Sequence, residues 1–142
     1  MMHIDDKDFA IIRVLKENSR LSIRDIAAKT RLRPSTVHQR ILRLREKGVI
    51  EKFTLKLNNK AMGEGFIVFM MVKTKPSALL DKLINNKHVK EFFGVTGEYD
   101  LLLKLKFKDV AEFNDFIIKF RKEQQIQTTL TMIATADIKE EL

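Results

Sequence analysis

The 142-residue sequence contains no cysteine, only two prolines and five glycines, and only three histidines, which are His3, His38 and His88. The absence of cysteine excludes disulfides, iron–sulfur clusters and cysteine-ligated zinc, and the isolated histidines lack the spacing of metal ligands. No apolar run approaches 18 residues, and the N-terminus lacks a basic region followed by an apolar one, so we expect a cytoplasmic protein without membrane spans. Catalytic triads and glycine-rich phosphate loops are also missing. We therefore expect no metal, no cofactor and no enzymatic activity.

The net positive charge is confined to one part of the chain. The first 60 residues hold 15 Lys and Arg against 7 Asp and Glu, whereas residues 61–142 hold 12 of each. Eight of the nine arginines lie in the first part. The arginine guanidinium can donate two parallel hydrogen bonds to a phosphate or to the edge of a guanine. A solvated surface without a ligand would scatter its charges along the chain. The composition thus predicts an N-terminal nucleic-acid-binding domain and a neutral second domain.

Three short helices are predicted in the first 50 residues. Asp5 or Asp6 can cap the first, whose apolar stripe is Phe9, Ile12 and Leu15, with Ile11 beside it. The second begins after Ser22, which has Asp25 three residues later as in a capping box. The third runs from Pro34 to about Lys47 and is stopped by Gly48, with an apolar stripe made of Val37, Ile41 and Leu44.

This arrangement is typical of a helix-turn-helix, in which the last helix enters the major groove of DNA. Ser35, Gln39 and Arg43 are predicted to project outward, flanked by Thr36 and Arg40. Arg40 or Arg43 can pair with guanine, Gln39 with adenine, and the hydroxyls with phosphates or bases. His38 would face solvent or a phosphate. The alternative is an ordinary three-helix bundle with a charged exterior.

The second half of the sequence predicts elements in the order β-α-β-β-α-β, which is a ferredoxin-like fold. Residues 64–74 are apolar on both alternating faces of a strand, further strands are expected at 89–95, 99–107 and 126–136, and helices at 77–85 and 109–123. The helices can cover only one face of the sheet. We expect a second subunit to cover the other, giving a twofold dimer that reads DNA half-sites about 34 Å apart or a multiple of that.

Several motifs resemble the Lrp/AsnC family, named after the leucine-responsive and asparagine-operon regulators. They are Asp5-Asp6-x-Asp8-x-x-Ile11-Ile12, Ile26-Ala27, Pro34-Ser35-Thr36-Val37 and Arg43-Leu44-x-x-x-Gly48-Val49-Ile50. The resemblance implies an α+β chain of the archaeal type: a winged-helix-like helix-turn-helix domain (1–50), a linker (51–62) with a hinge strand at 53–57, and a βαββαβ RAM domain (63–142) for effector binding and oligomerisation.

The resemblance also implies a function. The chain would be a sequence-specific transcriptional regulator whose DNA affinity or assembly responds to an amino acid, and whose dimers join into tetramers or octamers. A DNA-architectural protein of low specificity without an effector is the alternative. Salt-sensitive coverage of DNA without discrete protected sites would favour the alternative.

Two positions depart from the family pattern, because Arg31 replaces the turn glycine and Arg33 replaces the capping serine. We expect both arginines to contact phosphates, which position a protein without specifying sequence. In the family a Thr-Gly-x-x-Asp turn lines an amino-acid pocket between dimers. The corresponding residues here are Thr96, Gly97, Glu98, Tyr99 and Asp100, and the facing wall would be Met132, Ile133 and Ala134. Asp100 would bind the ammonium of the effector, and the Thr96-Gly97 turn its carboxylate.

Overall fold

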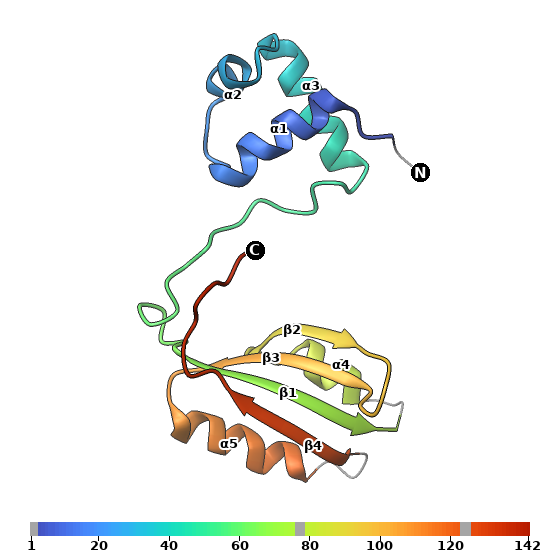
Figure 1. Ribbon diagram of the computed structural model, residues 1–142, viewed down its shortest axis with the longest axis vertical. Helices are drawn as coiled ribbons and strands as arrows, with labels where there is room; N and C mark the ends of the chain where they lie inside the picture. The colour runs from blue at the N-terminus through green and yellow to red at the C-terminus, as the bar shows by residue number, and fades with distance from the viewer. Residues whose placement is uncertain (1–2, 76–78, 123–125) are drawn as a thin grey trace. The chain divides into compact units, whose positions relative to one another are not determined.

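The computed structural model describes residues 3–75, 79–122 and 126–142 (Figure 1). The chain divides into two compact units, Met1–Leu55 and Lys56–Leu142, and this boundary lies inside the segment predicted as a linker. Residues 51–58 belong to no helix or strand, and Phe53, Leu55 and Leu57 are exposed. The predicted hinge strand at 53–57 is therefore not formed within a single chain, because a strand needs a neighbouring strand to satisfy its backbone hydrogen bonds.

The first unit is built from three helices, α1 (Asp6–Glu17), α2 (Ile23–Thr30) and α3 (Pro34–Glu46). Their buried core contains Ile11, Ile26, Ala27 and Val37. Ser22 caps α2 as predicted, and its hydroxyl accepts a hydrogen bond from the backbone N–H of Asp25 at 3.1 Å. After the C-terminal end of α3, Gly48 has a φ of 71°, and the N–H of Val49 donates a hydrogen bond to the carbonyl of Leu44 at 2.9 Å. This is the glycine-dependent helix stop that the sequence predicts.

The buried face of α1 differs from the predicted stripe. Phe9 is 54% exposed, whereas Asp8 has no exposed surface. Asp5 caps the helix and forms a reciprocal capping box with Asp8: each side chain accepts the backbone N–H of the other residue, at 2.9 and 3.2 Å. The inward face of α1 therefore contains Asp8 and Ile11. Phe9 lies outside it, and its predicted place in the apolar stripe of the core is wrong.

The second unit has the predicted β-α-β-β-α-β order. Its elements are β1 (Phe66–Thr74), α4 (Leu79–Ile84), β2 (Val89–Gly94), β3 (Leu101–Phe107), α5 (Val110–Arg121) and β4 (Ile126–Ile133). The strands form one antiparallel sheet in the order β2-β3-β1-β4. Ser77 and Glu123, two of the predicted helix ends, lie outside the described residues.

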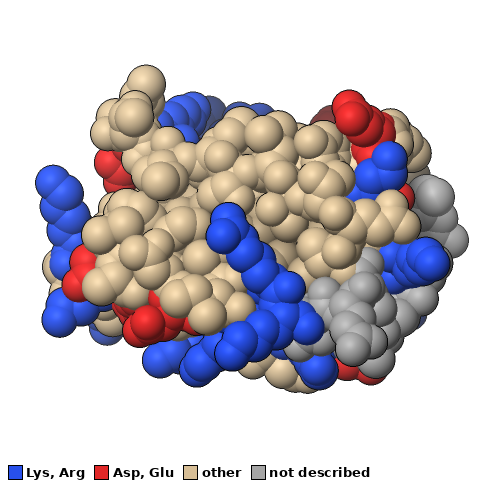
Figure 2. Space-filling model, turned by 90° about the horizontal axis from the view of Figure 1, so that it is seen from below, with Lys and Arg blue, Asp and Glu red and all other residues tan. Residues whose placement is uncertain are grey.

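The two faces of β1 have different neighbours. Val68, Met70 and Val72 are fully buried in a core that also contains side chains of α4 and α5, so both helices lie on that face (Figure 1). Phe69 and Met71 point to the opposite face, where the described residues include no covering helix. Figure 2 shows one side of the molecule, on which uncharged side chains form a broad area and a run of Lys and Arg side chains reaches from the lower margin into the middle.

The chain after β4 returns to β3 through an ionic contact. Glu140 accepts hydrogen bonds from Lys106 (2.9 Å), Asn59 (3.2 Å) and Lys56 (3.3 Å), and it also pairs with Lys104. These bonds, led by the one from Lys104, hold the pKa of Glu140 well below its ordinary value. The contact connects the start of the second unit, its third strand and its C-terminal segment.

Candidate nucleic-acid interface and effector site

The turn between α2 and α3 carries both arginines that depart from the family pattern. Arg31 adopts the left-handed conformation with a φ of 56°, and the N–H of Leu32 bonds back to the carbonyl of Ala27 at 3.1 Å. Arg33 precedes α3 in an extended conformation and makes no side-chain capping bond. Both side chains are exposed. The turn thus keeps the geometry that a glycine would favour, and it presents two cations beside the start of α3.

The first two turns of α3 present a polar surface. Ser35, His38 and Gln39 are exposed and Thr36 is half-buried, while Val37 and Leu44 face the core. The start of the helix also offers backbone N–H groups, which suit phosphate oxygens. Between Asp25 and Glu46 the sequence has no acidic residue. This surface can therefore approach a polyanion without repulsion from a carboxylate of its own segment.

Arg40 and Arg43 are bound to the first turn of α1. The Arg40 guanidinium donates to Asp5 at 2.6 Å and to Asp8 at 2.9 Å, and Arg43 donates to Asp8 at 2.8 Å. The hydrogen bond from Arg40, together with the backbone N–H of Asp8, lowers the pKa of Asp5 from 3.8 to about 2. The same pairing with Asp5 raises the pKa of Arg40. The sequence reasoning missed this network because it treated both arginines as outward-facing.

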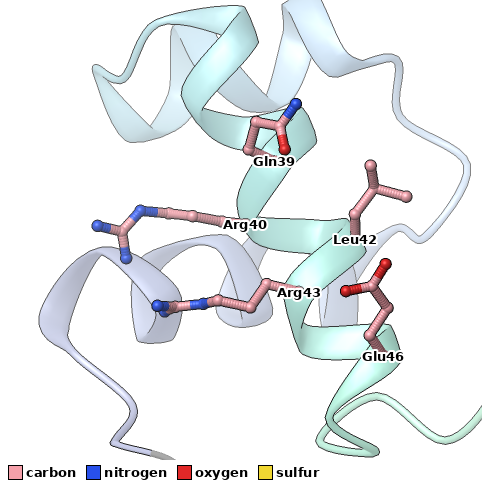
Figure 3. A pocket seen from close by; sticks show the side chains of 5 residues that line it. All are labelled: Gln39, Arg40, Leu42, Arg43 and Glu46. Atoms are coloured by element: carbon pink, nitrogen blue, oxygen red, sulfur yellow. The ribbon is translucent and has the colours of Figure 1, made fainter.

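A shallow groove of about 310 Å³ runs along α3, lined by Gln39, Arg40, Leu42, Arg43 and Glu46. In Figure 3 the two arginines extend to one side of the helix, and Leu42 and Glu46 lie on the other. The outward stripe of α3 thus includes Leu42 beside Ser35 and Gln39, and the Arg43 side chain, which is 47% exposed, extends from it to Asp8. A signal for the network was present in the sequence, because Asp5 and Asp8 are three residues apart, as are Arg40 and Arg43.

The turn predicted to bind an effector connects β2 and β3. Thr96, Gly97 and Glu98 are exposed, Gly97 has a φ of 114°, and Tyr99 is half-buried. The carboxylate of Asp100 accepts the backbone N–H of Thr74 at 2.9 Å, so it already fixes the end of β1. One of its oxygens remains without a hydrogen bond among the described contacts. The turn therefore offers a fixed carboxylate at the surface.

The other predicted wall of the effector pocket lies at the opposite end of β1. Val72 pairs with Leu101, next to the turn, whereas Val68 pairs with Ile133 and Phe69 with Met132. The N–H of Ala134 bonds to the carbonyl of Ile67 at 2.9 Å. Four residues of strand separate the two ends, a distance of roughly 14 Å. One chain does not bring the two walls together, so a pocket containing both needs a second copy.

Other kinds of site are not seen in the residues that the structure describes. They include no group of three His, Asp or Glu side chains that could hold a metal ion. No helix among them is long and apolar enough to cross a membrane.

Comparisons with known proteins agree with this architecture. Residues 4–51 match the family model for winged helix-turn-helix DNA-binding domains, and residues 67–142 match the Lrp/AsnC ligand-binding domain. The HTH-type transcriptional regulator FL11 of Pyrococcus furiosus is 36% identical over 133 residues, which cover 92% of this chain and 88% of FL11.

Two solved structures share the fold of the whole chain. A Neisseria meningitidis transcriptional regulator in complex with L-methionine has a TM-score of 0.91 at 23% identity, covering 98% of this chain and 94% of that one. The feast or famine regulatory protein of Mycobacterium tuberculosis, also complexed with L-methionine, has a TM-score of 0.89 at 21% identity, covering 97% and 96%. The chain therefore belongs to the Lrp/AsnC family, whose members are DNA-binding transcriptional regulators with a ligand-binding domain and are not enzymes.

Proposed function

We propose that this chain binds promoter DNA sequence-specifically as a twofold dimer, and that an amino acid changes its DNA affinity or its assembly. The exposed polar start of α3, which follows two exposed arginines in a segment without acidic residues, carries this proposal. In a helix-turn-helix this part of the recognition helix meets the base edges.

The contacts divide into two kinds. Arg31 and Arg33 bind phosphates, and Gln39 reads a base, where a bidentate pair with adenine supplies ~1–3 kcal/mol of discrimination. Ser35, Thr36 and His38 supply further phosphate or base contacts.

Two substitutions separate the kinds of contact. Gln39→Ala is expected to relax the preference at one base pair in each half-site. Arg33→Ala is expected to weaken binding to all sequences alike and to lower the salt slope by about one unit. Gel-shift titrations on operator and unrelated duplexes at several salt concentrations measure both effects. Equal loss of specificity in the two variants would contradict the division.

The open face of the sheet supports the dimer. Phe69, Met71 and Leu102 are half-buried there, and Leu130 and Met132 are 43% and 45% exposed. Lys104 and Lys106, which pair with Glu140, lie on the same face, and the apolar part of this face is covered most simply by the same face of a second copy. Two recognition helices then bind half-sites about 34 Å apart or a multiple of that, and further contacts between dimers give tetramers or octamers. Met71→Glu is expected to yield monomers in sedimentation velocity, and unchanged dimers would rule out this interface.

The turn from Thr96 to Asp100 supports an amino-acid effector, with Asp100 facing its ammonium and the far wall, Met132 to Ala134, supplied by another copy. L-methionine is the first probe, because it is the ligand in both solved structures described above. Asp100→Asn keeps an acceptor for the Thr74 N–H but removes the charge. We expect it to abolish effector binding in calorimetry without changing stability. Asp115→Asn, an exposed change of the same charge, is the control.

The deciding experiment is a footprint on the DNA upstream of the chain's own gene, with and without the twenty amino acids. Discrete, regularly spaced protection that changes with amino acids supports the whole proposal. Discrete protection that ignores them leaves a regulator without an amino-acid response. Salt-sensitive coverage without preference, here and at other promoters, would support the architectural alternative.

A further inference from the structure

Two carboxylates at the start of α1, those of Asp5 and Asp8, hold two arginines of α3 that the sequence predicts to meet DNA. This inference rests on the proposed function, because it concerns how α3 meets DNA. We propose that Asp8 is a positioning residue that, together with Asp5, keeps Arg40 away from DNA and leaves Arg43 only part of its guanidinium for DNA contacts. The number of α3 arginines available to DNA is thus set from another helix.

Burial makes Asp8 the centre of the network. Its side chain has no exposed surface, whereas 20% of the Arg40 side chain and 47% of the Arg43 side chain are exposed. A carboxylate enclosed this completely is stable only when it is paired and hydrogen-bonded. One Asp8 oxygen accepts from Arg40, and the other accepts from Arg43 and from the backbone N–H of Asp5. If both arginines moved to the DNA, a buried charge would remain without a partner.

The two arginines are held to different extents. Arg40 has two carboxylate partners, at 2.6 and 2.9 Å, and it is the less exposed. Arg43 has one partner, at 2.8 Å, so most of its five N–H donors remain available. Arg40 therefore stays paired with Asp5 and Asp8 when DNA binds, and only those N–H donors of Arg43 that do not bind Asp8 can contact DNA.

The network also removes charge from the DNA-facing side. Two aspartates offset two arginines, and both guanidiniums extend toward α1 rather than along the outward stripe (Figure 3). Uncharged Gln39 and Leu42 remain on that stripe. Base reading by α3 then depends on short polar groups, while Arg31 and Arg33, which have no such carboxylate partner among the described contacts, bind the phosphates.

The test measures the salt dependence of DNA binding by the full chain. Each cation that newly contacts a phosphate steepens the plot of log affinity against log salt concentration by about one unit. Asp8→Asn frees the guanidinium of Arg43 to reach a phosphate that it does not contact while Asp8 holds it, so the slope should steepen by about one unit and the ratio of specific to unrelated DNA affinity should fall. Asp5→Asn/Asp8→Asn should steepen the slope by about two units. Asp6→Asn is the matched control, because Asp6 is exposed in the same helical turn and loses the same charge.

A purely structural Asp8 would behave differently. Its replacement would lower the melting temperature and weaken DNA binding with an unchanged slope, and that result in a folded variant overturns the proposal. If Asp8→Asn does not fold, the salt slope of DNA binding by Arg40→Gln tests the proposal instead. An arginine that never reaches DNA can be removed without changing the slope, whereas a fall of about one unit would show that Arg40 contacts phosphate. Failure of the wild-type chain to bind any DNA would instead refute the proposed function.

Discussion

The two units of this chain place their charges in opposite ways. Residues 1–55 hold 13 Lys and Arg against 7 Asp and Glu, whereas residues 56–142 are nearly balanced, with 14 cations and 12 anions. In the first unit the exposed arginines of the turn after α2 have room for an outside partner. In the second unit the lysines of β3 pair within the chain, and an apolar sheet face is left open. Arginines without a carboxylate partner indicate a surface that binds a polyanion. Paired lysines beside an apolar sheet face indicate a surface that binds a second copy of the protein.

Each unit nevertheless has a carboxylate that holds more than one cation. Asp8 holds Arg40 and Arg43, and Glu140 holds Lys104 and Lys106 together with Lys56 at 3.3 Å. The guanidiniums are planar forks that fix the direction of each bond, whereas an ammonium is a point charge on a flexible stem. The first carboxylate thus orients side chains of α3, and the second mainly neutralises two lysines on the sheet.

The largest effect is expected from the core of the second unit. Phe107 is 1% exposed and packs against Phe113, with ring centroids 5.4 Å apart. Phe107→Ala should destabilise this unit by about 3–5 kcal/mol. Urea unfolding can be followed by the fluorescence of Tyr99, the only tyrosine in a chain without tryptophan. Ile118→Ala, at a position 56% exposed, is the control and should change the stability by less than about 0.5 kcal/mol.

The same variant tests independence. In Phe107→Ala, the first unit should lose its helical circular dichroism signal at the same urea concentration as in the wild type. A single shifted transition for both signals would mean that the units fold as one.

A smaller effect is expected at the ionic contact of Glu140. Glu140→Gln keeps a hydrogen-bond acceptor but loses the charge that pairs with Lys104 and Lys106. Because 13% of the Glu140 side chain is exposed, we expect a loss of about 1–2 kcal/mol in the second unit. Tyr99 fluorescence in urea measures it, with exposed Glu141→Gln as the control. An equal effect in both variants would mean that the pairing contributes little.

The sequence predicted the element order of both units, because their apolar periodicities are strong and their caps are explicit. Ser22, Gly48 and the two-faced strand at 66–74 are positions where local pattern and final structure agree. Three features were not predicted. Asp8 displaced Phe9 from the inner face of α1, because pairing with Arg40 and Arg43 offsets the burial of a charge, and periodicity does not register such long-range partners.

The other two features depend on what a single chain cannot supply. The segment 53–57, predicted as a hinge strand, pairs with no strand among the residues that the structure describes. The two predicted walls of the effector pocket occupy opposite ends of β1, a fact that follows from strand register rather than from the residues themselves. Register depends on the whole sheet, so the motif at 96–100 could identify a candidate turn but not what faces it.

The turn at Arg31 should separate stability from DNA binding. Its φ of 56° is costly for any side chain except glycine, by about 1 kcal/mol. Arg31→Gly should therefore stabilise the first unit by up to that amount, while the salt slope of DNA binding falls by about one unit. Circular dichroism melts and salt titrations measure the two effects. Arg31→Lys retains both the strain and the charge and should change neither. A stabilised Arg31→Gly with an unchanged slope would mean that this arginine does not touch phosphate.

The mildest test is the acid titration of the first unit. Asp5 has a pKa of about 2 when folded, against 3.8 ordinarily, because Arg40 and the N–H of Asp8 favour its charged form. A lowered folded-state pKa adds stability that is complete above the ordinary value and is lost as the pH falls from about 4 to about 2. The hydrogen-exchange protection factors of α1 and α3, which are corrected for the pH dependence of intrinsic amide exchange, should fall over this window in the wild type. In Asp5→Asn the contribution of this group disappears, and the fall should be smaller. An equal fall in both proteins would place the acid-sensitive group elsewhere, and the pairing of α1 with α3 would then depend on Asp8 alone.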